Sequence, residues 1–171
     1  CRTARRAAAR FGMIGRLLTR DGLEQGTRPA IAQARAALLG RPRRIIDATA
    51  GLGFDSAAFV ATGAPVIAIE REPVTARFLA ANVPGIEVIV GDAMVVLESL
   101  APTADDIVFL DPARRDGRRT ADGSRAHPER DPERWSPPLS FAVSLAERTR
   151  VCVKVSPGFT AVPADWCAMW S

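Results

Sequence analysis

The sequence predicts an α/β fold with a doubly wound, mostly parallel sheet. From residue 44 onward, short runs rich in Val and Ile alternate with Ala-rich stretches of helical periodicity, which is typical of parallel strands covered on both faces. The length of 171 residues suits one domain. With 47% hydrophobic and 25% charged residues, the composition excludes collagen-like, coiled-coil and wholly disordered chains. Apolar runs fall far short of the roughly 18 residues that span a bilayer.

The elements follow in order along the chain. Apolar positions three and four apart, such as Ile31, Ala34 and Leu38, predict helices over residues 3–20 and 28–39. We therefore expect a helical N-terminal segment over residues 1–43 and a sheet domain over residues 44–171. The expected strands cover residues 44–48, 66–70, 86–90, 106–110 and 150–155, and the expected helices cover residues 54–62, 73–82, 93–99 and 138–147. In such a fold the ligand crevice lies at the carboxyl ends of the strands.

Three further features concern the chain as a whole. It begins at Cys1 and stops within an apolar stretch, so we expect a piece of a longer protein whose C-terminal strands are truncated. Its three cysteines lack paired or metal-ligand spacing, which disfavours a disulfide framework or a metal site and fits a reducing cytoplasm. The irregular stretch over residues 112–137 exceeds the usual loop of an α/β unit and is a candidate lid or binding loop.

Charge is distributed unevenly. Residues 1–44 hold 11 Arg against two acidic residues, a net charge of +9, while residues 45–171 carry a net charge of −5. The basic segment can contact phosphates of a nucleic acid, or it can be a solvated Arg-rich helix. Since 22 of the 23 basic residues are Arg, we attribute the number of arginines to genome composition.

The first expected strand runs into residues 47–55, a stretch with the sequence DATAGLGFD. Gly51 and Gly53 would let the backbone approach a ligand closely. Ser56 occupies the third glycine position of the dinucleotide fingerprint, which disfavours a nicotinamide cofactor. A tight turn that binds nothing is the alternative.

Acidic residues also end the next two strands. Glu70 can accept both hydroxyls of a ribose, and Arg71 is either a base-stacking or a surface residue. Asp92, followed by Ala93, can hold an amine or a backbone group, although one such acid is often only a helix cap. Three carboxylates at successive strand ends favour a binding site.

The fourth and fifth strands deliver Asp111, Pro112 and Lys154 to the same edge. Pro112 stiffens the turn after Asp111. Lys154, the one lysine of the chain, can bind a phosphate, pair with Asp111 or snorkel to water. A strand-ending turn with two solvated arginines, Arg114 and Arg115, is the alternative for the Asp111 region.

This set of strand ends resembles the class I S-adenosylmethionine-dependent methyltransferases, which have a Rossmann-like fold. The resemblance covers residues 44 to about 157 and implies S-adenosyl-L-methionine as the cofactor, with Glu70 on the ribose and Asp92 on the adenine side. The implied cofactor-binding residues are Thr27, Asp47, Ala48, Thr49, Ala50, Gly51, Gly53, Phe54, Asp55, Glu70, Arg71, Asp92, Ala93 and Asp111.

Several short motifs, among them residues 18–25 and 153–157, also resemble the bacterial methyltransferases that carry a THUMP-like domain. That resemblance implies an RNA substrate and a further module beyond Ser171. The implied catalytic residues are Asp111, Pro112, Arg114, Arg115 and Lys154. The turn departs from the family pattern, because Ala113 and Arg114 stand where a second proline and an aromatic residue are associated with methylation of base amino groups.

Three functions follow as hypotheses. The first is an RNA methyltransferase with a guanine as a candidate target, in which Asp111 accepts a proton and Arg114 and Arg115 contact phosphates. The second is a small-molecule methyltransferase. The third is a non-catalytic module that binds the cofactor or RNA.

Overall fold

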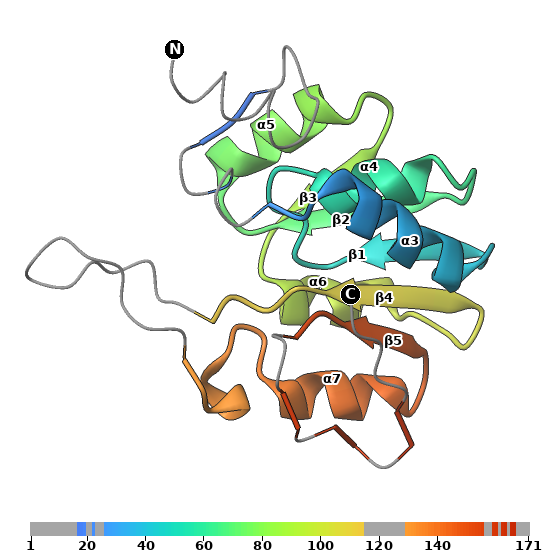
Figure 1. The fold of residues 1–171 in the computed structure, drawn as a ribbon, viewed down its shortest axis with the longest axis vertical. Coiled ribbons are helices and arrows are strands. Elements are labelled where there is room, and N and C mark those ends of the chain that lie inside the picture. Colours follow the sequence, from blue (N-terminus) through green and yellow to red (C-terminus); the bar gives the residue numbers. More distant parts are fainter. Residues whose placement is uncertain are drawn as a thin grey trace, which may run out of the picture.

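A computed structural model describes residues 17–19, 22, 26–114, 129–155, 159–160, 162–163 and 165–166. Within these residues five parallel strands form one sheet in the order β3-β2-β1-β4-β5 (Figure 1). The strands are β1 (Arg44–Asp47), β2 (Val66–Glu70), β3 (Glu87–Val90), β4 (Asp106–Leu110) and β5 (Arg150–Val153). The strand order reverses between β1 and β4, which makes their carboxyl ends the switch point where such sheets bind ligands.

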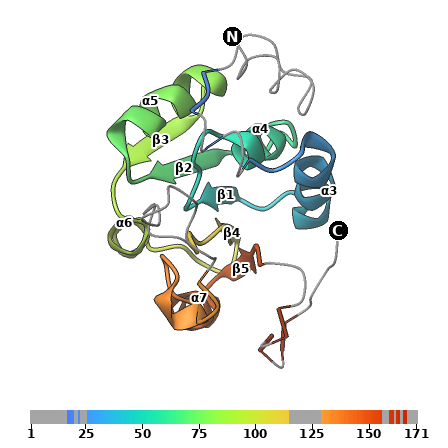
Figure 2. The ribbon, with the colours of Figure 1, turned by 60° about the vertical axis from the view of Figure 1, so that its left-hand side comes forward.

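Helices cover both faces of the sheet, as predicted (Figure 2). The helices are α3 (Pro29–Leu39), α4 (Phe54–Val60), α5 (Pro73–Asn82), α6 (Ala93–Leu100) and α7 (Leu139–Ala146), with the short 3₁₀ helix η1 (Pro132–Arg134) before α7. One face carries α3, α4 and α5, and the other carries α6 and α7. The fold is thus the expected Rossmann-like α/β arrangement.

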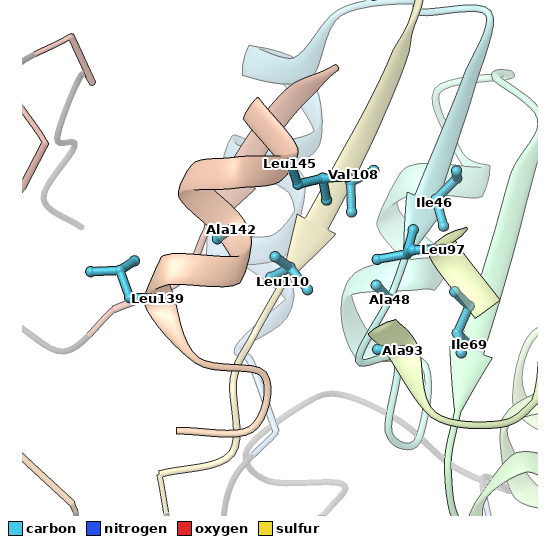
Figure 3. Close-up of a cluster of buried hydrophobic side chains, with 10 residues drawn as sticks. All are labelled: Ile46, Ala48, Ile69, Ala93, Leu97, Val108, Leu110, Leu139, Ala142 and Leu145. Carbon is cyan, nitrogen blue, oxygen red and sulfur yellow. The ribbon is translucent and has the colours of Figure 1, made fainter. Parts of the chain in front are cut away.

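The alternation of side chains along each strand separates two cores. In β1, Ile45 packs with Phe59 of α4 and Phe109 of β4, whereas its neighbour Ile46 packs on the opposite face. Figure 3 shows that second core. Its buried members are Ile46, Ala48, Ile69, Ala93, Leu97, Val108, Leu110, Leu139, Ala142 and Leu145. These packed faces fix the strand register and hence the positions of the strand ends.

The element bounds agree with the sequence predictions to within two residues, apart from the N-terminal segment. The expected helix over residues 28–39 is α3. The expected helix over residues 3–20 lies outside the described residues except for 17–19, which are not helical. Ala36 of α3 is buried in the same core as Ile45 and Phe59, so α3 packs on the sheet domain. The division at residue 43 stays a prediction.

The N-terminal segment packs against the glycine turn at Leu17 and Leu18. The side chain of Asn82, at the end of α5, accepts the Leu17 N–H at 2.8 Å and donates to the carbonyls of Leu17 at 2.9 Å and Leu52 at 3.0 Å. Leu18 and Phe78 pack against buried Leu52 and Phe54. One buried amide therefore joins the N-terminal segment to the turn that follows β1.

A charged cluster anchors the opposite edge of the sheet. Asp106, fully buried at the start of β4, binds Arg43 at 2.7 Å and Arg44 at 3.1 Å and accepts the Thr103 N–H at 2.9 Å. Burial raises the pKa of such a carboxyl, but these partners outweigh burial and hold the pKa of Asp106 below its usual value. The cluster stabilises the edge that lies away from the expected site.

The long irregular stretch begins and ends in a short stem. Ala113 and Ser136 form an antiparallel bridge, and the Glu129 N–H donates to the Arg114 carbonyl at 2.7 Å. Buried Trp135 donates its indole N–H to the Glu129 carbonyl at 3.0 Å. Residues 115–128, including Arg115, lie outside the described residues, so the expected lid over residues 112–137 stays a prediction. No helix in the described part of the chain is long and apolar enough to cross a membrane.

Candidate functional site

The turn after β1 contains two glycines with different roles. Gly51 has a φ of 55° and Gly53 a φ of 85°, backbone that favours glycine at both positions. A Cβ on Gly53 would lie 2.5 Å from Leu79 and 2.8 Å from Val83, whereas a Cβ on Gly51 would meet no atom within 4 Å. Gly53 therefore allows α5 to pack closely, and Gly51 leaves open space at the switch point.

Asp47 ends β1 as a buried carboxyl. It is 1% exposed, and its Oδ2 accepts the Ser56 hydroxyl at 2.5 Å. Its Oδ1 is buried and has no hydrogen-bond partner within the described part of the chain. Burial raises the pKa of Asp47 from 3.8 to about 7, although the Ser56 hydrogen bond opposes the rise. The Thr49 backbone also opposes the rise in the pKa of Asp47.

Glu70, at the end of β2, is held by two backbone groups. Its Oε2 accepts the Gly51 N–H at 2.9 Å, and its Oε1 accepts the Glu72 N–H at 2.8 Å. Each carboxylate oxygen has a further lone pair, so both oxygens can still accept a hydroxyl. The fixed carboxylate is consistent with the predicted ribose contact.

The remaining adenine-side candidates are less enclosed. Asp92 is the N-cap of α6, and its side chain accepts the Met94 N–H at 2.9 Å. Arg71 is exposed, and its Nε lies 3.9 Å from Glu72 Oε1. Ala93 is buried in the core beneath the strand ends. The capping role that the sequence left open for Asp92 is therefore present, and its contact with a cofactor stays a prediction.

Asp111 and Lys154 meet at the ends of β4 and β5. The Lys154 ammonium forms an ion pair with Asp111 Oδ2 and donates to Thr27 Oγ1 at 3.0 Å. The Asp111 N–H donates to Thr49 Oγ1 at 2.6 Å, which ties the end of β4 to the glycine turn. Burial raises the pKa of Asp111, and the Lys154 ammonium opposes that rise. Of the alternatives for Lys154, the structure places it in the pair with Asp111.

Asp55, in the first turn of α4, is engaged by two partners. Its Oδ2 accepts the Thr27 hydroxyl at 2.6 Å, and its Oδ1 is paired with the Arg35 guanidinium. Thr27 thus lies between Asp55 and Lys154. The residues that the sequence singled out separately, namely Thr27, Asp55, Asp111 and Lys154, form one group.

The other predicted residues of the turn and of the catalytic motif lie close by. Pro112 is buried directly after Asp111, and Arg114 is half-buried in the stem. Ala48, Ala50 and Phe54 are buried around the glycine turn, where they shape the backbone. The structure therefore brings the described candidates to one edge of the sheet, while Arg115 lies outside the described residues.

Sequence reasoning missed three residues that organise this edge. Ser56 was seen only as a missing glycine, although its hydroxyl binds Asp47. Arg35 is one of many arginines in the N-terminal segment, but in the fold it pairs with Asp55 and lies over the Phe109 ring. Asn82 carries no signal in the sequence, because its partners Leu17 and Leu52 are 65 and 30 positions away.

The chemistry of the site fits the expected cofactor. Open space at Gly51, an unpartnered buried oxygen on Asp47 and the fixed carboxylate of Glu70 would meet a ligand that has hydroxyl and amino groups and lies against the backbone. Several carboxylates near one edge also favour a positively charged ligand centre. Among the described residues, no group of three or more His, Cys, Asp or Glu side chains could hold a metal ion.

Curated relatives match part of the chain. The ribosomal RNA small subunit methyltransferase J of Alkalilimnicola ehrlichii is 45% identical over 69 residues, covering 40% of this chain and 25% of that protein. The protein of the same name from Hydrogenovibrio crunogenus is 36% identical over 104 residues, covering 52% of this chain and 37% of that protein. The chain thus spans well under half the length of these two relatives.

Solved structures share the fold. A "putative methyltransferase from Porphyromonas gingivalis W83" superposes with a TM-score of 0.65 at 22% identity, covering 91% of this chain and 39% of that chain. The "putative methyltransferase yhhF" of Escherichia coli superposes with a TM-score of 0.53 at 20% identity, covering 84% of this chain and 79% of that chain. At these identities the likeness shows the fold alone.

A family profile provides the assignment. The profile described as "Putative SAM-dependent methyltransferase" matches residues 13–123, which is more than half of the chain and includes the glycine turn, Glu70, Asp92 and Asp111. With the fold and the strand-end residues in place, the chain belongs to this family of S-adenosylmethionine-dependent methyltransferases.

Proposed function

We propose that the full-length protein transfers a methyl group from S-adenosyl-L-methionine to RNA, with a guanine as a candidate target. The observation that carries the proposal is the glycine turn at the switch point. Gly51 leaves open space there, and its N–H is held by the Glu70 carboxylate. This arrangement presents backbone and carboxylate groups to a nucleoside that lies across the strand ends.

Two observations support RNA as the substrate. The relatives from Alkalilimnicola ehrlichii and Hydrogenovibrio crunogenus are named as methyltransferases of the small-subunit ribosomal RNA. The N-terminal segment, with its net charge of +9 over residues 1–44, suits contact with a phosphate backbone. Under this proposal the protein is cytoplasmic, and the resemblance of its short motifs implies a THUMP-like module in the full-length chain.

The site residues have distinct tasks in this mechanism. Glu70 would hold the ribose hydroxyls, and Asp47 and the backbone at Gly51 would border the methionine portion. The bound cofactor supplies an electrophilic methyl group. The protein's contribution is to align the acceptor atom with that group at roughly 3 Å and to exclude water. Pro112 is buried directly after Asp111. It stiffens the turn that would align the acceptor atom.

Asp111 is the proposed proton acceptor. An exocyclic amine must lose a proton as the new bond to carbon forms, and a carboxylate within hydrogen-bond reach can accept that proton. Burial, which raises the pKa of Asp111, makes its carboxylate a stronger base. Lys154 opposes this effect but fixes the orientation of the carboxylate. Arg114 and Arg115 would contact phosphates of the RNA.

The experiment measures cofactor binding and methyl transfer side by side. Calorimetry with S-adenosylhomocysteine should show a severe loss of affinity for Gly51→Val, because its side chain fills open space rather than protein. Gly53→Ala is the matched comparison, and it should lower the unfolding free energy because its Cβ meets Leu79 and Val83. Unchanged affinity in folded Gly51→Val would contradict the site.

Single-turnover transfer to total RNA tests the substrate class and the role of Asp111. Asp111→Asn should lower the transfer rate by about 10²- to 10⁴-fold with little change in cofactor affinity. Transfer to small-molecule extracts but not to RNA would favour a small-molecule enzyme. Cofactor binding without any transfer would favour a non-catalytic module.

A further inference from the structure

A continuous chain of polar contacts joins α3 to the candidate catalytic turn. It begins at Arg35, which pairs with Asp55 of α4. The Thr27 hydroxyl donates to the other oxygen of Asp55 at 2.6 Å and accepts from the Lys154 ammonium at 3.0 Å. Lys154 completes the chain in its pair with Asp111. Five residues from four separate parts of the sequence thus share one network.

The Thr27 hydroxyl gives this network a direction. A hydroxyl has one hydrogen to donate, and here that hydrogen goes to Asp55, so its lone pairs face Lys154. Thr27 is buried, which limits exchange of these partners with water. A movement of Asp55 would therefore be transmitted through Thr27 to the ammonium of Lys154.

Positive and negative charges alternate along the network. Asp55 and the Lys154 ammonium both bind Thr27 Oγ1, and the same ammonium is paired with Asp111. Arg35 is largely buried, with 14% of its side chain exposed, and its guanidinium lies 5.0 Å from the centre of the Phe109 ring. Packed in this way, Arg35 neutralises Asp55 and leaves Lys154 to pair with Asp111.

We infer that Arg35 and Asp55 are positioning residues for Asp111 and act through Thr27 and Lys154. The inference rests on the proposed function, since it assigns a task to Asp111 in methyl transfer. Arg35 keeps Asp55 from attracting the ammonium, and the ammonium in turn holds the Asp111 carboxylate in the orientation that accepts a proton. Neither positioning residue needs to touch the substrate or the cofactor.

The charged groups around Asp111 predict that substitutions of Arg35 and Asp55 shift its pKa in opposite directions. Lys154 and Arg35 lower the pKa of Asp111, and Asp55 raises it. Asp47, at the end of β1, is a further acidic neighbour. Removing the positive charge of Arg35 should therefore raise the pKa of Asp111, and removing the negative charge of Asp55 should lower it. Charge alone gives these opposite signs, so the substitutions at Thr27 test whether the effect passes through its hydroxyl.

The test uses the full-length protein and two independent readouts. The first is a ¹³C NMR titration of the Asp111 carboxyl, assigned with Asp111→Asn. The second is the acidic limb of the pH profile of kcat/KM for methyl transfer. In both readouts Arg35→Gln should shift the midpoint to higher pH and Asp55→Asn should shift it to lower pH. Arg148→Gln and Asp105→Asn are matched controls, because both residues are exposed near the opposite edge of the sheet.

Substitutions at Thr27 test the connection itself. Thr27→Val keeps the shape of the side chain but removes the hydroxyl, and it should lower kcat about tenfold or more, since small displacements of reacting groups reduce rates strongly. Thr27→Ser retains the hydroxyl and should restore most of that loss. Arg35→Lys, which retains the charge, should lie close to the wild type in the NMR titration.

The outcomes separate this inference from the proposed function. Shifts of the same sign, or no shift, in Arg35→Gln and Asp55→Asn would overturn the inference, as would a pH profile that does not follow the NMR titration. Thr27→Val with wild-type kcat would also overturn it. Opposite NMR shifts in a protein whose wild type transfers no methyl group would instead overturn the proposed function and leave the coupling established.

Discussion

Asp47 shows how one buried carboxyl adds a pH dependence to the whole molecule. Its pKa is raised from 3.8 to about 7 by burial, so at mildly acidic pH the folded protein holds a proton that the unfolded chain has released. The unfolding free energy must then fall as the pH rises through this window. A ligand that donates a hydrogen bond to Asp47 Oδ1 would stabilise the charged form of this carboxyl.

We expect Asp47→Asn to remove this component of the pH dependence. Between about pH 5 and pH 8 the wild type should lose on the order of 2 to 3 kcal/mol relative to the variant, at about 1.4 kcal/mol per pH unit below the folded-state pKa. Urea denaturation at a series of pH values measures this difference. Parallel curves for the two proteins would show that Asp47 titrates normally in the folded state.

The sequence best predicted the site residues that lie at the ends of strands. Asp47, Glu70 and Asp111 could be located because parallel strands bring their carboxyl ends to one edge. The pairing of Lys154 with Asp111 was one of the alternatives that the sequence offered, but the other partners could not be predicted. The Thr27 contact with Lys154 joins positions 127 apart, and Arg35 was one of many arginines. Such pairs depend on the packing of helices against the sheet, which periodicity does not encode.

At the scale of elements, Asn82 connects α5 to the N-terminal segment. Its side chain forms hydrogen bonds with the backbone of both Leu17 and Leu52. Since Leu52 belongs to the glycine turn, this amide ties the backbone at Leu17 to that turn.

We expect Asn82→Leu to release the N-terminal segment without unfolding the sheet. The change leaves backbone groups unpaired, each at a cost of about 1 to 3 kcal/mol where the group stays buried. Limited proteolysis should cut the variant faster than the wild type before α3, while far-ultraviolet circular dichroism stays unchanged. Equal cleavage rates would mean that the packing of Leu18 and Phe78 is sufficient to hold the segment.

At the scale of the whole molecule, the parallel sheet and its helices could be predicted because they depend on repeated apolar patterns. The strand bounds differ from prediction by two residues or fewer, and the central strands β1, β2 and β4 are largely buried. The stem between Ala113 and Ser136 could not be predicted, because a single bridge between irregular segments leaves no periodic signal.

The charge asymmetry predicts how the molecule binds RNA. If the basic segment over residues 1–44 contacts phosphates, the logarithm of affinity should fall with the logarithm of salt concentration by roughly 0.7 per neutralised phosphate on single strands. Fluorescence anisotropy with a labelled RNA measures the slope. Removal of residues 1–16, which include Arg2, Arg5 and Arg10, should reduce the slope, and an unchanged slope would exclude them.

The stem also makes the position of Asp111 independent of the length of the stretch between Arg114 and Glu129. Ala113 forms a bridge with Ser136, and the Arg114 carbonyl accepts the Glu129 N–H. These backbone contacts fix the two ends of the stretch next to the turn after Asp111. Lengthening a closed loop is cheap, at about 0.6 kcal/mol for each doubling. The sequence between Arg114 and Glu129 can therefore be lengthened, shortened or exchanged with little effect on the position of Asp111.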